Sequence, residues 1–356
     1  MRIIHTADLH LGSSLGSALP ADKIAERRRE LVGTFANMAD YAESRGAELM
    51  LLAGDVFDAN LPPRTDKDYF YDVVKKHPNI KFLYLKGNHD CVTSFTEELP
   101  NLFTFGPEWT CYRFGNVCVY GIELPEKGKR AAAESLICDP NDINIVMLHG
   151  QTGSTDDDIV IRDYAGKGID YVALGHVHSY SCGDIDGRGK YVYCGCPEGR
   201  GFDETGEKVF VELETGAGVS HRFIPFAQRT IRLVETDVSG ARDKQEALAM
   251  AIAMTGDIPQ KDILRLVFTG ETSFDTAGLA ADTKERLKHR FYNVSVKDET
   301  RSGIDVDAVA TEETLAGEFV RLARDADIPE ELDRSRIITI GLKALYGDLA
   351  DYKKER

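Results

Sequence analysis

The chain has 356 residues, 42% of them apolar and 29% charged, a composition typical of globular proteins with enough apolar material for more than one core. The formal net charge is −16, and acidic residues are in excess on both sides of residue 226. Neither part therefore has the basic balance that is usual in proteins that bind nucleic acid. Neither a signal peptide nor an apolar run long enough to span a membrane is present, so we expect a cytoplasmic protein without membrane contact.

The seven cysteines are scattered without the spacing of a disulfide framework, as expected of a protein from a reducing compartment. Cys194 and Cys196 could bind a metal or form a redox pair. Two cysteines alternating along a strand is the simpler interpretation, and we assign them no chemistry.

Strands and helices alternate in the first half of the chain. In chain order we expect a strand over 1–7, a helix over 22–44, a strand over 49–53, a helix over 66–76, and strands over 80–85, 117–122, 143–148 and 169–174. The run 49–53 is continuously apolar and is followed by Gly54, which is typical of a strand buried on both faces.

Beyond residue 174 the pattern changes. Hairpin-like strands are expected over 190–194, 209–213 and 219–225. A new unit then follows, with a strand over 230–234, a helix over 244–254, a strand over 263–268, a helix over 275–288, a strand over 292–296, and helices over 311–324 and 335–352. We therefore predict an α/β fold with mixed sheets, in two domains that cover residues 1–227 and 228–356.

Nearly every potential metal ligand in the first domain comes directly after a predicted strand, in most cases beside a glycine. The segments are Asp8-Leu9-His10, Gly54-Asp55, Gly87-Asn88-His89-Asp90, Leu148-His149-Gly150 and Gly175-His176-Val177-His178. The carboxyl ends of strands gather at one edge of an α/β fold, and carboxylate, imidazole and amide groups together suit Mn²⁺, Fe²⁺ or Zn²⁺. Each segment alone could equally be a turn or a helix cap. Because five such segments occur in order, each after a strand, the sequence predicts a metal site.

These segments resemble the signature of the calcineurin-like metallophosphoesterases, and no ligand is missing. Further stretches are similar to the SbcD-type DNA repair exonucleases: His5–Gly12, Gly54–Asp58 with Pro62-Pro63, Tyr171–His176, Tyr193–Glu198, and Phe202-Asp203-Glu204 before Lys208. The resemblance extends over roughly residues 1–215. It implies a four-layer α/β/β/α sandwich for the catalytic domain and a small α/β capping domain after it.

The resemblance also implies a role for each residue of the site. One divalent ion would be held by Asp8, His10, Asp55 and His178, and the other by Asp55, Asn88, His149 and His176. A hydroxide between the two ions would attack a phosphodiester, while His89 would steady the phosphate and protonate the leaving oxygen. Asp58 and Asp90 would orient ligands. Mn²⁺ is the expected ion, with Fe²⁺, Zn²⁺ and Mg²⁺ as alternatives.

Other charged residues are expected to have no part in this chemistry. His5, His77, His221 and His289 stand in no ligand motif, and we expect none of them to bind metal. Arg27, Arg28 and Arg29 spread around a helix, so we expect solvated surface at these positions instead of a phosphate-binding track.

Three functions remain open. The resemblance implies a DNA exo- or endonuclease, of a type that is commonly dimeric and works with an SbcC-like coiled-coil ATPase, which would face the final helices. The acidic balance and the short stretch between Asp90 and His149 favour a smaller phosphodiester or phosphomonoester as substrate. A non-catalytic assembly subunit is the third hypothesis, but a scaffold has no physical need for a complete ligand set.

Overall fold

The computed structural model of the chain describes residues 1–15, 19–59, 62–90, 93, 97–216, 218–326, 329 and 334–346. Two compact units form: Met1–Arg232 with Lys261–Ile263, and Leu233–Gln260 with Leu264–Arg356. The first division falls at Arg232, near the boundary expected at residue 227. Among the described helices, none is long and apolar enough to cross a membrane.

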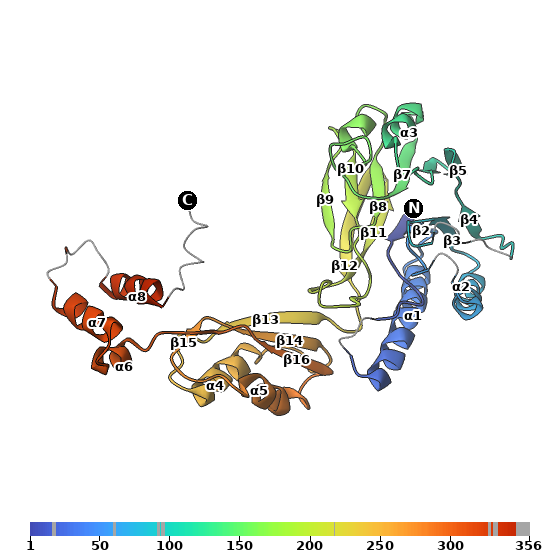
Figure 1. Ribbon diagram of the computed structural model, residues 1–356. Helices are drawn as coiled ribbons and strands as arrows, with labels where there is room; N and C mark the ends of the chain where they lie inside the picture. The colour runs from blue at the N-terminus through green and yellow to red at the C-terminus, as the bar shows by residue number, and fades with distance from the viewer. Residues whose placement is uncertain are drawn as a thin grey trace. The chain divides into compact units, whose positions relative to one another are not determined.

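The N-terminal unit contains two six-stranded sheets (Figure 1). The first has the strand order β12 (Val219–Pro225), β11 (Val209–Thr215), β1 (Arg2–Thr6), β2 (Leu49–Ala53), β3 (Lys81–Leu85), β4 (Leu102–Thr104). The second has the order β5 (Thr110–Phe114), β6 (Val117–Gly121), β7 (Ile143–His149), β8 (Tyr171–Gly175), β10 (Lys190–Tyr193), β9 (Ser181–Asp184).

Parallel pairing places the strand ends that carry polar residues at one edge of each sheet. In the first sheet Ile4 pairs with Met50 and Met50 with Phe82, so β1, β2 and β3 run in the same direction. In the second sheet His149 at the end of β7 pairs with Gly175 at the end of β8. The loops that follow these five strands are therefore neighbours within their sheets.

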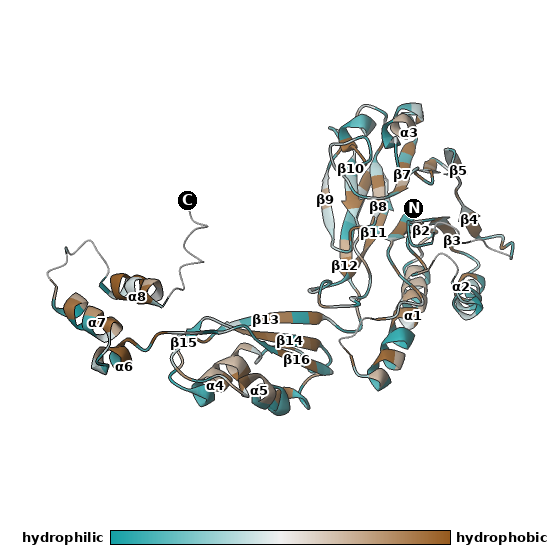
Figure 2. Cartoon of the chain, in the orientation of Figure 1, coloured by the Kyte–Doolittle hydropathy of each residue, from teal (hydrophilic) through white to brown (hydrophobic). Residues whose placement is uncertain are grey.

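The two sheets are the inner layers of a four-layer sandwich. Helices α1 (Ala21–Ser44) and α2 (Arg64–Lys76) share a buried cluster with one face of the first sheet, in which the rings of Phe35 and Phe70 stack. A second cluster fills the space between the sheets with residues such as Leu51 and Ile145. Helix α3 (Lys129–Ser135) and the short 3₁₀ helix η1 (Ile161–Tyr164) pack in a third cluster on the second sheet. This confirms the expected α/β/β/α order, and Figure 2 shows the hydrophobic residues concentrated on the central strands.

Several short elements are absent from the sequence-based prediction. Strands β4, β5 and β9 and helix α3 fall where we predicted no element. The burial patterns of β5 and β9 contain no completely buried residue, so their sequences lack a strong apolar signal. Such edge strands form because a neighbouring strand offers hydrogen-bonding partners, which is a tertiary effect.

Arg27 corrects one expectation. Its side chain is 1% exposed, not solvated, and it forms ion pairs with Glu30 and with Glu198 at 3.1 Å. It also donates to the carbonyl oxygen of Gly199 at 2.9 Å. Arg28 and Arg29 are exposed, as predicted. Helical spacing alone did not indicate that the 198–199 loop would cover this face of α1.

The C-terminal unit has its own small core. Strands β13 (Ile231–Asp237), β14 (Ile263–Thr269) and β16 (Asn293–Asp298) form a sheet, which packs with α4 (Lys244–Met254) and α5 (Leu279–Leu287). A two-stranded sheet of β15 (Glu271–Thr272) and β17 (Arg301–Ser302) belongs to the same unit. Helices α6 (Val306–Thr311), α7 (Leu315–Asp325) and α8 (Arg334–Leu345) share a separate cluster around Val320 and Leu342.

Several predicted helix boundaries differ from those observed, and the helix expected to begin at residue 275 begins at Leu279. The expected helix over 311–324 begins at Leu315, because the Thr314 side chain accepts a hydrogen bond from the Gly317 N–H and caps a new helix there. The last helix, expected to reach residue 352, ends at Leu345, and the predicted part beyond residue 346 lies outside the described residues.

Candidate metal centre

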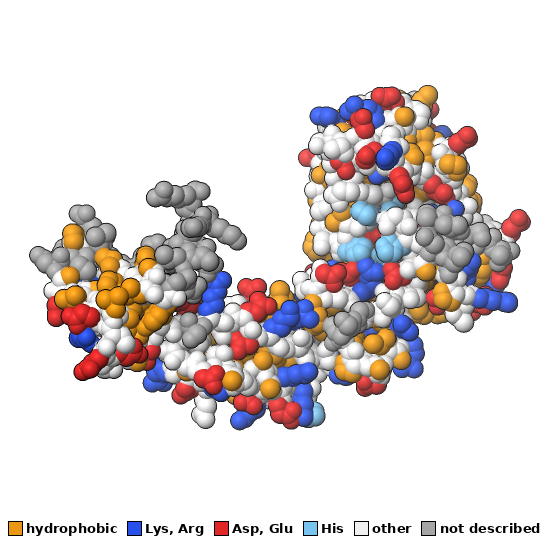
Figure 3. Space-filling model, in the orientation of Figure 1, with side chains coloured by type: hydrophobic (Ala, Val, Ile, Leu, Met, Phe, Trp, Pro, Cys, Tyr) orange, Lys and Arg blue, Asp and Glu red, His pale blue; other side chains and the backbone are white. Residues whose placement is uncertain are grey.

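The predicted ligand segments meet at the edge where the parallel strands of both sheets end. Asp8 and His10 follow β1, Asp55 follows β2, and Asn88 follows β3, while His149 ends β7 and His176 and His178 follow β8. Figure 3 shows histidine side chains gathered on one face of the N-terminal unit, next to acidic ones. All seven predicted metal ligands lie in this cluster.

One group consists of Asp8, His10 and His178, whose ligand atoms all lie within 4.8 Å of one another. The Nε2 atoms of His10 and His178 are 3.3 Å apart, and the Nε2 of His178 is 3.8 Å from Oδ1 of Asp8. Asp8 and His10 are buried. These atoms converge as ligands of a single cation would.

The second group consists of Asp55, His149 and His176. Asn88 lies between the two imidazoles, since its Oδ1 is 3.1 Å from Nε2 of His149 and 3.0 Å from Nδ1 of His176. Asp55 also relates the two groups, because its Oδ2 is 3.3 Å from Nε2 of His149 and 3.9 Å from Nε2 of His10. Asp55 and Asn88 therefore lie close to the imidazoles with which the resemblance groups them, and their assignment to particular ions stays a prediction.

The backbone is strained at this site. Among the described residues, five other than glycine have a positive φ, and four of them are Asp8, His10, Asp55 and His176. Such conformations cost of order 1–3 kcal/mol each and persist where the surrounding structure enforces them. Gly54 has a φ of 93°, and a Cβ there would clash with the His149 ring, so only glycine allows the ring so close. The chain thus accepts local strain to bring these side chains together.

The charges in the cluster fit a cation. Burial, aided by the charge of Asp55, raises the pKa of Asp8 to about 7. Burial also acts to raise the pKa of Asp55, but the hydrogen bond and charge of His149 outweigh it and lower that pKa to about 2. Burial acts to lower the pKa of His149, yet Asp55 outweighs it and raises that pKa to about 9. Buried carboxylates that hold a proton on a neighbouring imidazole offer a favourable place for a divalent ion.

His89 lies at the rim of the cluster. Its side chain is 46% exposed, its Nδ1 is 3.4 Å from Oδ1 of Asp58, and its ring meets that of His10 edge-on with 4.8 Å between centroids. His10, Asp58 and His89 form a third group of close ligand atoms. Asp58 meets the Nδ1 of His10, at 2.7 Å, whereas the Nε2 of His10 lies near His178. The contact therefore orients His10 and leaves its Nε2 available.

Two residues close to the site had no role in the sequence analysis. Glu204 lies 2.7 Å from Nδ1 of His178, and Arg200 lies 2.6 Å from Glu204 and 3.3 Å from Asp58. Burial acts to raise the pKa of Glu204, but its hydrogen bonds with His178 and Arg200 outweigh it and hold that pKa well below the usual range. Phe202-Asp203-Glu204 appeared only as part of the resemblance, and no periodic or spacing signal points to Arg200.

A cavity of about 470 Å³ opens beside the second group. Asn88, His149 and His176 line one side of it. The other lining residues include the apolar Pro107, Leu124 and Pro125 and the cationic Lys86 and Lys129. Glu123 and Glu126 line it as well, and Lys86 pairs with Glu123 at 3.2 Å, so the two ammonium groups are matched by two carboxylates. The size of the cavity is that of small-molecule sites.

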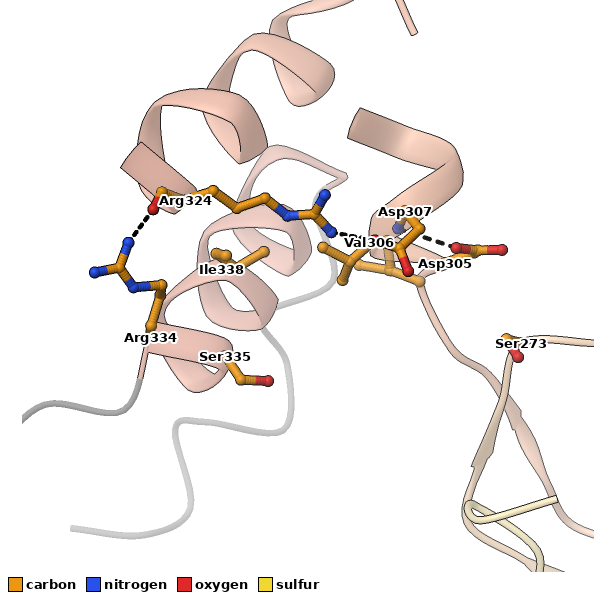
Figure 4. Close-up of a pocket in the computed structure, with 9 residues that line it drawn as sticks. Ser273, Asp305, Val306, Asp307, Arg324, Arg334, Ser335 and Ile338 are labelled. Atoms are coloured by element: carbon orange, nitrogen blue, oxygen red, sulfur yellow. Dashed lines mark hydrogen bonds and ion pairs between the residues drawn. The ribbon is translucent and has the colours of Figure 1, made fainter. Parts of the chain in front are cut away.

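Another cavity, of about 670 Å³, lies in the C-terminal unit (Figure 4). There Arg324 pairs with Asp307, and Arg334 donates to the backbone carbonyl oxygen atoms of Ala323 and Arg324. None of the groups of close ligand atoms found among the described residues includes a residue of this cavity. We assign it no catalytic role.

Comparison with known proteins defines the class. The family model described as calcineurin-like phosphoesterase matches residues 1–180, just over half of the chain. The chain therefore belongs to the calcineurin-like phosphoesterases, and the resemblance deduced from its motifs is confirmed. It is accordingly a metal-dependent phosphoesterase.

Individual relatives are more distant. The chain is 23% identical to the DNA double-strand break repair protein Mre11 of Methanopyrus kandleri, over 98% of this chain and 82% of that protein. It is 26% identical to the SbcD subunit of the nuclease SbcCD of Escherichia coli K12, over 60% of this chain and 65% of that protein. The chain spans about half the length of several other curated relatives that it matches. A solved structure, a dimetal phosphatase from Danio rerio, aligns with a TM-score of 0.40 at 9% identity over 63% of this chain and 98% of that one.

Proposed function

We propose that the protein is a two-metal phosphodiesterase that cleaves DNA as an exo- or endonuclease, with Mn²⁺ as the ion it uses. The observation that carries the proposal is the convergence of two groups of ligand atoms, with Asp55 in contact with both. The proposed ligands are Asp8, His10, Asp55, Asn88, His149, His176 and His178. The names of the relatives, a DNA double-strand break repair protein and a nuclease, support DNA as the substrate.

Two divalent ions, when bound, would activate water as the nucleophile and offset the charge that develops on the phosphate. The protein itself supplies the ordered surroundings. The backbone N–H of His89 donates to Oδ1 of Asp55 at 2.8 Å, which fixes this carboxylate from the β3 loop. Asp58 lies beside the Nδ1 of His89, so the Nε2 of this half-exposed ring is free to donate a proton to the leaving oxygen.

A small phosphodiester or phosphomonoester is the second candidate substrate. The cavity of about 470 Å³ next to Asn88, His149 and His176 favours it, because a space of this size beside the ligands can hold one compact ester. The net charge of −16 also favours it over a long polyanion.

The C-terminal unit is proposed as the capping domain, and its last helices as the surface for a coiled-coil ATPase partner. Leu315 and Leu322 on α7 are 75% and 63% exposed, and Leu345 and Tyr346 at the end of α8 are 44% and 54% exposed. Large apolar side chains this exposed on adjacent helices commonly mark a protein contact.

The proposal is tested with purified protein and Mn²⁺ on linear duplex DNA, single-stranded DNA and bis-p-nitrophenyl phosphate. We expect hydrolysis of all three, abolished by chelation. His89→Ala should keep both ions and lower kcat by about 10²–10⁴-fold, because it removes the proposed proton donor without removing a ligand. His289→Ala, at an exposed histidine of the C-terminal unit, is the matched control and should leave turnover unchanged.

Each other outcome has a definite meaning. Hydrolysis of the small diester without degradation of DNA would favour the second candidate. Silence on every substrate, with metal bound, would support a non-catalytic assembly subunit. Loss of metal from His89→Ala would contradict the role given to His89.

A further inference from the structure

A single arginine connects the two imidazoles of the first ligand group through carboxylates that contact their Nδ1 atoms. The Nη1 of Arg200 is 3.3 Å from Oδ1 of Asp58, and its Nη2 is 2.6 Å from Oε1 of Glu204. Asp58 in turn lies 2.7 Å from Nδ1 of His10, and Glu204 lies 2.7 Å from Nδ1 of His178. The chain of contacts thus runs from one imidazole to the other through two carboxylates and one guanidinium.

The direction of these hydrogen bonds determines which ring nitrogens can bind a cation. An ionised carboxylate can only accept, so the Nδ1–H groups of both rings donate to Asp58 and Glu204. The Nη2 of Arg200 is also 3.2 Å from Nδ1 of His178, but Oε1 of Glu204 is the nearer partner at 2.7 Å. Each ring therefore presents an unprotonated Nε2, and the two Nε2 atoms face each other at 3.3 Å. Fixing the tautomer in this way is what residues behind a metal ligand generally do.

The network is held tightly. The side chains of Arg200, Glu204 and Asp58 are 17%, 5% and 20% exposed. Arg200 contacts Glu204 through both its Nε and its Nη2, and its backbone N–H also donates to Glu204 at 2.8 Å. A planar guanidinium can engage two carboxylates at once in a fixed geometry, which a lysine ammonium cannot reproduce.

The second ligand group is supported differently. The Nδ1 of His149 meets the carbonyl oxygen of Ala53 at 2.9 Å, and the Nδ1 of His176 faces Oδ1 of Asn88 at 3.0 Å. Asn88 is itself a proposed ligand, so the outer support seen in this group is that of β2 for His149, whereas the loop that carries Arg200 and Glu204 supports His178. A change at Arg200 or Glu204 should therefore affect one cation and spare the other.

We propose that Arg200 and Glu204 are positioning residues that orient His10 and His178 for one of the two divalent ions. The inference rests on the proposed two-metal function. A purely structural role, in which Arg200 only secures the loop that begins after Tyr193, would weaken both ions alike or lower the stability of the whole unit.

Mn²⁺ titration followed by calorimetry and electron paramagnetic resonance separates these roles. The variants are Glu204→Gln, Arg200→Ala and Arg200→Lys, with Asp203→Asn as the matched control, because Asp203 is an exposed carboxylate in the same loop. In Glu204→Gln and Arg200→Ala we expect one of the two ions to bind about 10–100-fold more weakly while the other is unchanged, so the signal of the coupled Mn²⁺ pair is lost at intermediate Mn²⁺. Arg200→Lys should fall between Arg200→Ala and the unaltered protein, and Asp203→Asn should match the latter.

Thermal unfolding without metal decides the remaining cases. Unchanged binding of both ions in Glu204→Gln and Arg200→Ala, or equal weakening of both, would overturn the positioning role. If Glu204→Gln or Arg200→Ala unfolds before it can be titrated, Arg200→Lys decides the question. Normal binding of both ions by Arg200→Lys, shown to be folded by circular dichroism, would then overturn the positioning role. If the unaltered protein takes up no Mn²⁺, the proposed function fails, and this result is distinct from failure of the inference.

Discussion

Asp90 ties together the two loops that carry Asp55 and Asn88, and its removal should be costly. Its Oδ2 accepts hydrogen bonds from the N–H groups of Val56 and Phe57 at 3.0 and 3.3 Å and from the hydroxyl of Tyr84 at 2.7 Å. Its Oδ1 accepts from the N–H of Gly87 at 2.7 Å. The carboxylate itself has no exposed surface.

The magnitude follows from the groups that Asp90→Ala would leave unsatisfied. Three backbone N–H groups and one hydroxyl would lose their acceptor in a buried place, and each such loss costs about 1–3 kcal/mol. Burial, with the charge of Asp55, raises the pKa of Asp90, so part of the gain is offset by the cost of burying this carboxylate. We therefore expect a loss of about 3–5 kcal/mol in the free energy of unfolding.

Urea denaturation followed by circular dichroism measures this loss without metal. Tyr84→Phe, which removes one of the four hydrogen bonds, should cost about 1 kcal/mol, and Asp90→Asn should lie between the two because it keeps one acceptor oxygen. A cost below about 1 kcal/mol for Asp90→Ala, or one no larger than that of Tyr84→Phe, would refute the reasoning.

The remaining predictions concern the cavity and the acid response. Lys129 lines the cavity beside the second ligand group. Lys129→Met should raise KM for a phosphodiester about fivefold with little change in kcat, equivalent to about 1 kcal/mol of lost charge attraction. Lys127→Met, outside the cavity lining, should change neither constant, and equal effects of the two variants would exclude a contact between Lys129 and the substrate. Burial lowers the pKa of His5 to about 3, below its value in the unfolded chain. Between about pH 6.5 and 3 the unfolded chain therefore binds a proton at His5 that the folded protein does not bind, and the stability falls as the pH falls through this window. Urea denaturation should show the unaltered protein losing about 2 kcal/mol more than His5→Gln between pH 7 and 5, and parallel losses would contradict the assignment.

The local sequence determined the elements and the chemistry that follows them. The apolar run Leu49–Ala53 is typical of a strand buried on both faces, and Gly54 after it permits the turn that presents Asp55. The same logic applies at Asp8 and Asn88. Since strand ends in a parallel sheet share one edge, the order of the motifs was sufficient to bring these residues together in prediction.

Only the tertiary structure decided which side chains contact and orient the proposed metal ligands. Arg200 and Glu204 reach His178 from a loop without periodicity, and Arg27 is buried because the 198–199 loop covers α1. The edge strands β5 and β9 likewise depend on a neighbour for their hydrogen bonds. Short motifs report the residues that must follow a strand, whereas charge pairs between distant segments depend on how the layers pack, and that information is spread over the whole chain.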